Sequence, residues 1–306
     1  MNILEIADVS KRYGEYLALK HINIQIKEAC VFGLLGPNGA GKTSLIRIIN
    51  QITAPDEGQL FFKGEPMTIR HTAQIGYLPE ERGLYRKMKV GEQALYLSLL
   101  KGLDKTEALR RLHYWFEKFE IEAWWNKKVE ELSKGMQQKI QFIVTIVHEP
   151  AFLIFDEPFS GFDPLNANLL KEEMINLKNK GASIIFSTHN MASVEALCDD
   201  IALINKSEKI LDGSLKDIRQ AYKRNVFEIK YISDNVENIA AVLPPGAEVV
   251  KARREDNLNT VSVQLPHQFT GNQLLVQLLP HMQICEFKEV YPTMEEIFIQ
   301  SVSNNQ

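Results

Sequence analysis

The sequence predicts an α/β fold with two domains. Short apolar runs of strand type alternate with helical segments along most of the chain, which is typical of a parallel sheet covered by helices. Between about residues 90 and 145 the pattern is mainly helical, and after about residue 221 it changes to strands followed by helices. We therefore expect a first domain over residues 1–218, with a helical subdomain at about 86–146, and a small α+β domain over 222–306.

The composition is that of an ordinary globular chain. Its 306 residues are 45% hydrophobic and 24% charged, with a formal net charge of -4. Because nucleic-acid-binding proteins usually carry a basic face, this mild acidity argues against nucleic acid as a partner. The three cysteines, Cys30, Cys198 and Cys285, are far apart and match no metal or redox spacing. The longest apolar stretches fall well short of the roughly 18 residues of a membrane-spanning helix.

The first 52 residues are predicted to form strands, a loop and a helix. Ile22, Ile24 and Ile26 alternate with polar residues, which indicates a half-buried strand. The continuous apolar run at residues 30–35 indicates a buried parallel strand. After a glycine-rich turn, apolar residues recur at helical spacing in residues 42–52.

The same two periodicities place the later elements. Apolar residues recur every three to four positions, which predicts helices, at residues 90–103, 105–119, 133–147 and 169–181. Buried strands are expected in between, at residues 151–156, 182–188 and 201–213. The second domain is expected to contain strands at 226–232, 247–253 and 260–265, then helices at 271–282 and 293–303.

The stretch GPNGAGKTS, residues 36–44, carries the strongest chemical signal and is called the phosphate loop below. It fits G-x-x-x-x-G-K-[ST], follows an apolar strand and opens a helix, so a P-loop NTPase core is predicted. Its backbone N–H groups and the helix N-terminus would bind phosphate, Lys42 would reach the terminal phosphates, and Thr43 would bind Mg²⁺. The expected phosphate-binding residues are Gly36, Pro37, Asn38, Gly39, Ala40, Gly41, Lys42, Thr43 and Ser44.

A second apolar strand ends in two acids. Asp156 and Glu157 follow the run at residues 152–155, at the end of the strand where ligands bind in open α/β sheets. Asp156 would hold Mg²⁺, and Glu157 would orient or deprotonate the attacking water. A plain solvated strand end is the alternative. Combined with the phosphate loop, the two acids predict a Mg-nucleotide phosphohydrolase.

Four further motifs resemble those of the ABC family of ATPases, in the family's order. ELSKGMQQK, residues 131–139, resembles the family signature LSGGQ, although Lys134 departs from it. SGFD, residues 160–163, resembles the D-loop, and IIFSTHN presents His189 like the family's switch histidine. Tyr13 matches the aromatic residue that stacks on adenine. The resemblance implies ATP and Mg²⁺ as cofactors.

The resemblance also implies a mechanism shared between two subunits. Two ATPase domains close head to tail around two ATP molecules, each held by the phosphate loop of one subunit and the signature of the other. Ser133 and Gly135 would face the γ-phosphate of the partner's ATP, and Asp163 of the D-loop belongs to the same nucleotide site. Glu157 would polarise the water and His189 would contact the γ-phosphate.

Several features indicate transport rather than another use of the ATPase. The chain has one ATPase unit, no long coiled-coil insertion, and motifs such as GYLPEERGLYRKM and YPTMEEIFI that resemble the ATP-binding subunits of bacterial type-2 ABC exporters, including the sodium-efflux branch. This implies a multi-helix membrane permease and a second ATPase copy, identical or paralogous, as partners. It also implies a cytoplasmic protein, peripheral at the inner face of the cell membrane. The alternatives are a soluble ABC ATPase that clamps a ribosome or other assembly and, less favoured, a stand-alone kinase.

Two neighbouring acids follow the strand expected at residues 75–78. The family usually has Gln at the position of Glu80, where it touches Mg²⁺ or the attacking water beside the contact with the membrane subunit. The resemblance therefore implies that Glu80 lies beside the metal. Glu81 and Arg82 are expected to be solvated or on the docking face, and a simple loop charge is the alternative for Glu80.

Overall fold

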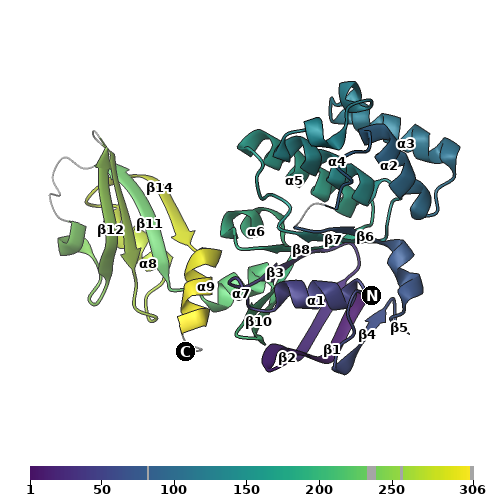
Figure 1. Ribbon diagram of the computed structural model, residues 1–306. Helices are drawn as coiled ribbons and strands as arrows, with labels where there is room; N and C mark the ends of the chain where they lie inside the picture. Colours follow the sequence, from purple (N-terminus) through teal and green to yellow (C-terminus); the bar gives the residue numbers. More distant parts are fainter. Residues whose placement is uncertain (81–82, 233–238, 256–257, 304–306) are drawn as a thin grey trace. The chain divides into compact units, whose positions relative to one another are not determined.

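The computed structural model describes residues 1–80, 83–232, 239–255 and 258–303 (Figure 1). The chain separates into two compact units, one of Met1–Leu215 with Ser301–Gln306 and one of Lys216–Gln300. The first unit is an α/β core with a helical subdomain, and the second contains its own sheet. The predicted α/β fold class is confirmed.

A six-stranded sheet lies at the centre of the first unit, in the order β10-β9-β3-β8-β7-β6. All neighbours are parallel except β9 and β10. Strands β3, β7, β8 and β9 are buried along their whole length, as expected where helices cover both faces of a parallel sheet. The strand bounds are β3 (Val31–Leu35), β6 (Ile75–Leu78), β7 (Phe152–Asp156), β8 (Ser183–Thr188), β9 (Asp200–Asn205) and β10 (Glu208–Ser214).

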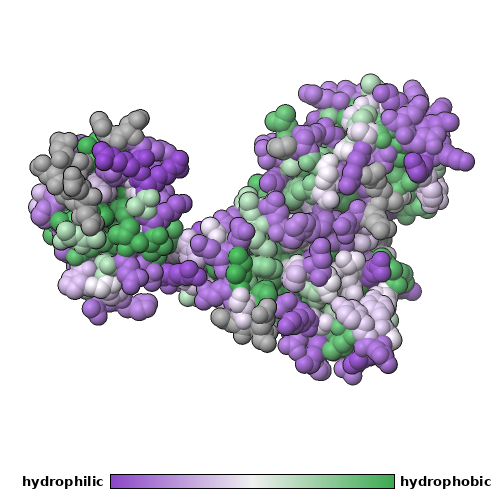
Figure 2. Space-filling view, turned by 60° about the vertical axis from the view of Figure 1, so that its left-hand side comes forward, coloured by the Kyte–Doolittle hydropathy of each residue, from purple (hydrophilic) through white to green (hydrophobic). Residues whose placement is uncertain are grey.

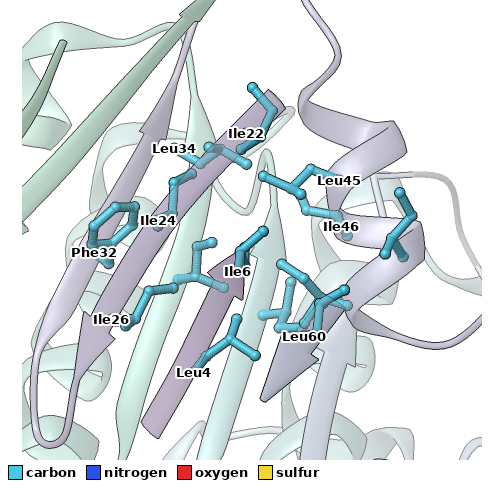
Figure 3. Close-up of a cluster of buried hydrophobic side chains, with 14 of the residues drawn as sticks. Leu4, Ile6, Ile22, Ile24, Ile26, Phe32, Leu34, Leu45, Ile46 and Leu60 are labelled. Carbon is cyan, nitrogen blue, oxygen red and sulfur yellow. The ribbon is translucent and has the colours of Figure 1, made fainter. Parts of the chain in front are cut away.

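A second, antiparallel sheet packs against helix α1 (Lys42–Ile49) and the central sheet. Its order is β2-β1-β4-β5. Figure 3 shows how side chains from both sheets and α1 meet in one apolar cluster that includes Ile24, Leu34 and Leu45. This packing fixes α1, and with it the phosphate loop at its start. The strands are β1 (Asn2–Tyr13), β2 (Tyr16–Lys27), β4 (Glu57–Phe62) and β5 (Glu65–Pro66).

The helical subdomain lies on the opposite side of strands β6–β8 from α1 (Figure 1). Asp104 caps α3 by accepting hydrogen bonds from the first turn, as Ser133 does for α4. Lys118 on α3 forms an ion pair with the buried Glu173 on α5, with 2.6 Å between Nζ and Oε1. This contact links the subdomain to the core. The subdomain helices are α2 (Val90–Leu100), α3 (Lys105–Lys118) and α4 (Lys134–Ile146). The other helices are α5 (Pro164–Asn179), α6 (Met191–Leu197) and, after β10, α7 (Leu215–Ala221).

The second unit is a four-stranded antiparallel sheet covered by helix α8 (Gly271–Leu278). Its order, β12-β13-β11-β14, is that of a split βαβ sheet in which the short 3₁₀ segment Ile239–Val242 stands in place of the first helix. Leu274 and Leu278 of α8 pack on buried side chains of β11 and β13, so this unit has its own core. The remaining elements are β11 (Val226–Ile232), β12 (Glu248–Glu255), β13 (Leu258–Gln264), β14 (Gln283–Val290) and α9 (Met294–Ser303).

The surface seen in Figure 2 is mostly hydrophilic, with smaller apolar areas on each unit. Within the residues that the structure describes, none of the helices combines the length and the apolar character needed to cross a bilayer.

Candidate functional site

The phosphate loop joins β3 to α1, and its backbone requires glycine at both ends. Gly36 has φ 151°, and a Cβ on it would lie 2.2 Å from the carbonyl oxygen of Ile204. Gly41 has φ 114°, and a Cβ there would lie 2.3 Å from the carbonyl oxygen of Ala18. Any side chain at either position would therefore displace the backbone of a neighbouring segment. Helix α1 begins directly after Gly41, so its N-terminal N–H groups face the loop.

Lys42 is held inside this loop by backbone carbonyls. Its Nζ atom donates to the oxygens of Gly36 at 2.7 Å and Pro37 at 3.1 Å. Burial lowers the pKa of the ammonium, and the negative charges of Glu157 and Asp156 act in the opposite direction. The Nζ atom thus lies at the phosphate loop, where an anion that enters the site would meet it.

Asp156 lies at the end of β7 and is only 3% exposed. Burial raises the pKa of this carboxyl group, and the hydrogen bond donated by the Ser187 hydroxyl to Oδ1 opposes the shift. Ser187 belongs to β8, the next strand of the sheet. Because Asp156 is almost fully buried, its charge depends on polar partners and on any cation that enters the site.

Glu157 follows in a left-handed backbone conformation, with φ 47°. Its side chain is held by Thr188, the last residue of β8, and by His189, which follows the strand. His189 Nδ1 lies 2.8 Å from Glu157 Oε1, and Thr188 Oγ1 donates to Glu157 Oε2 at 3.4 Å. The carboxylate is thus oriented by hydrogen bonds, and His189 keeps most of its ring exposed.

These groups line one pocket of about 430 Å³, called the phosphate-loop pocket below. The structure brings together most of the predicted site: the phosphate loop from Asn38 onward, both acids, Glu80 and His189. Glu81 and Arg82 lie outside the described residues. The lining residues are Tyr16, Asn38, Gly39, Ala40, Gly41, Lys42, Thr43, Ser44, Glu80, Asp156, Glu157, Ser160 and His189.

The predicted signature residues lie outside this pocket. Ser133 is the N-cap of α4, and its hydroxyl accepts a hydrogen bond from the backbone N–H of Met136 at 3.3 Å. Gly135 lies in the first turn of the same helix. Asp163 caps α5 by accepting from the N–H groups of Leu165 and Asn166. Both helix starts are capped, but Ser133, Gly135 and Asp163 do not line the phosphate-loop pocket of their own chain.

Comparisons with known proteins identify the family. A family model described as ABC transporter matches residues 19–160, and one described as the C-terminal domain of a DrrA1-3-like ATP-binding protein matches residues 213–302. The uncharacterized ABC transporter ATP-binding protein YhaQ of Bacillus subtilis (strain 168) is 41% identical over 300 residues, which is 98% of each chain. The chain belongs to the ABC transporter family. It is an ATP-binding subunit with a DrrA-like C-terminal domain.

Other ABC proteins support this assignment. The ABC transporter ATP-binding protein NatA of Bacillus subtilis (strain 168) is 31% identical over 247 residues, covering 78% of this chain and 100% of NatA. A solved ATP-binding subunit of an ABC transporter is 31% identical with a TM-score of 0.68, covering 72% of this chain and 93% of that chain. The resemblance inferred from the motifs is confirmed, and the soluble-clamp alternative is not favoured.

Two lining residues of this ABC subunit were not predicted. Tyr16 and Tyr13 pair across the turn between β1 and β2, and it is Tyr16 that lines the pocket and donates to the carbonyl of Gly39 at 2.7 Å. Tyr13 does not line it. Ser160, in the D-loop, receives a hydrogen bond on its carbonyl oxygen from Gln138 of α4. The resemblance included Ser160 in the D-loop motif but assigned only Asp163 of that motif to the nucleotide site, and no sequence pattern marks Tyr16.

The oxygen atoms around the pocket suit Mg²⁺. Thr43, Asp156 and Glu80 all line it and offer hydroxyl and carboxylate oxygens, which this hard cation prefers. Within the described parts of the chain, no group of three His, Cys, Asp or Glu side chains is arranged to hold a metal ion alone. The site therefore fits an ion that arrives with phosphate oxygens and keeps some of its water ligands.

Proposed function

We propose that this ABC subunit binds and hydrolyses Mg-ATP and thereby powers a membrane exporter. The observation that carries the proposal is the convergence of the phosphate loop, Asp156, Glu157 and His189 on one pocket. A helix N-terminus and loop N–H groups suit a triphosphate, and two consecutive acids at the end of one strand suit a metal ion and a water molecule. Among the pockets lined by described residues, the one beside β1 and β2, the one beside β6 and the one in the second unit lack these groups.

The residues divide the chemistry between them. Lys42 binds the terminal phosphates, and Thr43, Asp156 and Glu80 are the proposed protein ligands of Mg²⁺, which would neutralise phosphate charge when bound. Glu157 accepts a proton from the attacking water or orients it. His189 positions the Glu157 carboxylate and, being exposed, can contact the γ-phosphate.

A second copy of the subunit completes the site in this proposal. Ser133, Gly135 and Asp163 lie outside the phosphate-loop pocket of their own chain. The first turn of α4 presents N–H groups without intrahelical acceptors and the positive end of the helix dipole, which suits a γ-phosphate brought by another copy. ATP would then hold two subunits together, and hydrolysis would release them.

The permease is proposed to dock in a groove beside β6, called the β6 groove below. The groove has a volume of about 520 Å³ and is lined in part by Ile52, Leu84, Leu100 and Lys101. Ile52 and Leu100 are 61% and 65% exposed, so apolar side chains in this groove are open to a partner. Because β6 leads to Glu80, a partner seated here would sense changes in the phosphate-loop pocket. The subunit would thus work at the inner face of the cell membrane.

The proposal is tested with the purified subunit and with its permease. Calorimetry should show ATP binding that depends on Mg²⁺. A separate assay of phosphate release should show that the bound ATP is hydrolysed. Expressed with a candidate multi-helix permease, the subunit should copurify with that protein and drive export from vesicles. Absence of Mg-dependent ATP binding would refute the ATPase assignment, and copurification with ribosomes in place of the membrane protein would refute transport.

A further inference from the structure

One buried serine touches both acids of the phosphate-loop pocket. Ser187 lies on β8, paired with Asp156 of β7, and its side chain is fully buried. Its hydroxyl donates to Asp156 Oδ1 and accepts a hydrogen bond from the backbone N–H of Glu157 at 3.2 Å. The same N–H also reaches the Ser187 carbonyl oxygen at 3.2 Å. Ser187 therefore contacts the side chain of Asp156 and the backbone N–H of Glu157.

We propose that Ser187 is a positioning residue for Mg-ATP, which holds the Asp156 carboxylate in the orientation that accepts the metal ion. The inference rests on the function proposed above. A buried carboxylate that lacks a hydrogen-bond donor loses its preferred orientation and much of its charge stabilisation. Lys42 does not fill this role, because its ammonium donates to the carbonyls of Gly36 and Pro37.

The geometry at Glu157 assigns a second part to the same hydroxyl. A left-handed backbone is unfavourable for a residue with a side chain, and Glu157 has φ 47°. Its N–H is shared between two oxygens of Ser187, so the serine helps to hold this conformation. This left-handed conformation directs the Glu157 side chain toward Thr188 and His189. Loss of the hydroxyl should thus affect the metal first and the water-activating carboxylate second.

The chain offers a matched control on the same strand. Ser183 is also fully buried, and its hydroxyl also accepts a backbone hydrogen bond, from Ala29 at 2.9 Å. It lies at the start of β8, and it does not line the phosphate-loop pocket. Ser183→Ala therefore removes a comparable buried hydroxyl without touching either acid.

The experiment compares Ser187→Ala, Ser187→Cys, Ser187→Thr and Ser183→Ala in the full chain. ATP binding is measured by calorimetry at a series of Mg²⁺ concentrations and in EDTA, with thermal unfolding alongside. Partners of metal ligands typically contribute about 10- to 100-fold in metal affinity, so Ser187→Ala should raise the half-saturating Mg²⁺ concentration by about that factor. Its ATP affinity in EDTA should stay within about twofold of the parent value, since uniform phosphate contacts are kept.

The other variants separate positioning from packing. Ser187→Cys keeps the shape of the side chain with a slightly larger atom that donates weakly, so its half-saturating Mg²⁺ concentration should fall between those of the parent and Ser187→Ala. Ser187→Thr keeps the hydroxyl and should have the parent value. Ser183→Ala should change only the unfolding temperature. The proposal is overturned if Ser187→Ala and Ser187→Cys keep the parent Mg²⁺ dependence, or if Ser183→Ala shifts it equally. A parent protein without Mg-dependent ATP binding would instead refute the proposed function.

Discussion

His189 Nδ1 lies 2.8 Å from Glu157 Oε1, although the two residues follow different strands. The contact exists because β7 and β8 are adjacent and parallel, so the residues after them emerge at the same edge of the sheet. Thr188 reaches the other oxygen of the carboxylate. The orientation of Glu157 is thus set by the protein's own side chains.

Glu157→Gln should keep ATP binding and lose turnover. The amide keeps the size of the side chain and one acceptor oxygen, but its NH₂ group replaces the other acceptor and the side chain cannot accept a proton from water. Loss of a general base typically lowers the rate by about 10²- to 10⁴-fold. Phosphate release measures the rate, and size-exclusion chromatography with ATP should show an accumulated dimer. Normal turnover in this variant would exclude Glu157 as the base.

Lys42→Ala should weaken ATP binding by about 10- to 100-fold, the contribution of hydrogen bonds to a charged group. The reason is that the ammonium lies at the phosphate loop, where it is held by carbonyls and not by a carboxylate. Calorimetry gives the affinity. Lys105→Ala, at an exposed position outside the pocket, is the control and should bind as the parent does. Unchanged binding by Lys42→Ala would contradict the role of the loop.

Ser133→Arg should block ATP-dependent dimer formation and leave ATP binding by the monomer intact. Ser133 caps α4 and lies outside the phosphate-loop pocket, so its substitution removes nothing from the site of its own chain. The arginine would fill the space that a partner's phosphate is expected to occupy. The assay combines this change with Glu157→Gln and follows the dimer by chromatography. Unaffected ATPase activity of Ser133→Arg alone would contradict a site shared between subunits.

Much of this site could be predicted because it is local in sequence. The phosphate loop and the acids after β7 occupy short segments whose glycines and apolar strand are visible in the sequence. Tyr16 and Ser187 could not be found in this way. Tyr16 lines the pocket only through the turn that pairs it with Tyr13, and Ser187 reaches Asp156 only through the pairing of β7 with β8. Both depend on strand register, which a single sequence does not specify.

Stability should fall as the pH drops from about 6.5 toward 4, because of His148. Burial lowers the pKa of this side chain to about 4, and the charges of Lys101 and Arg111 contribute. Above the unfolded pKa, near 6.5, both states hold a neutral ring, so nothing is lost. Below it the unfolded state gains a proton that the folded state refuses, at a cost of at most about 3 kcal/mol. Urea unfolding across this range measures the effect.

His148→Gln should flatten that part of the pH profile, since glutamine does not titrate. The contributions of other groups stay in both proteins, so the difference between the two profiles isolates His148. Parallel profiles over this range would show that the ring is protonated equally in both states.

Glu80→Gln should raise the half-saturating Mg²⁺ concentration for ATP binding and should tighten the binding of ATP without metal. Glu80 lines the phosphate-loop pocket and is exposed, and its charge acts on both Lys42 and Asp156. The amide keeps an oxygen ligand but removes one negative charge near the metal and the phosphates. For an exposed group this charge contributes about 1–2 kcal/mol, or roughly 5- to 30-fold in half-saturating Mg²⁺. Removal of its repulsion should tighten ATP binding in EDTA, whereas Glu28→Gln, an exposed acid outside the pocket, should change neither value. If the ATPase rate, the Mg²⁺ dependence and the coupling to export are all unchanged, Glu80 is only a loop charge.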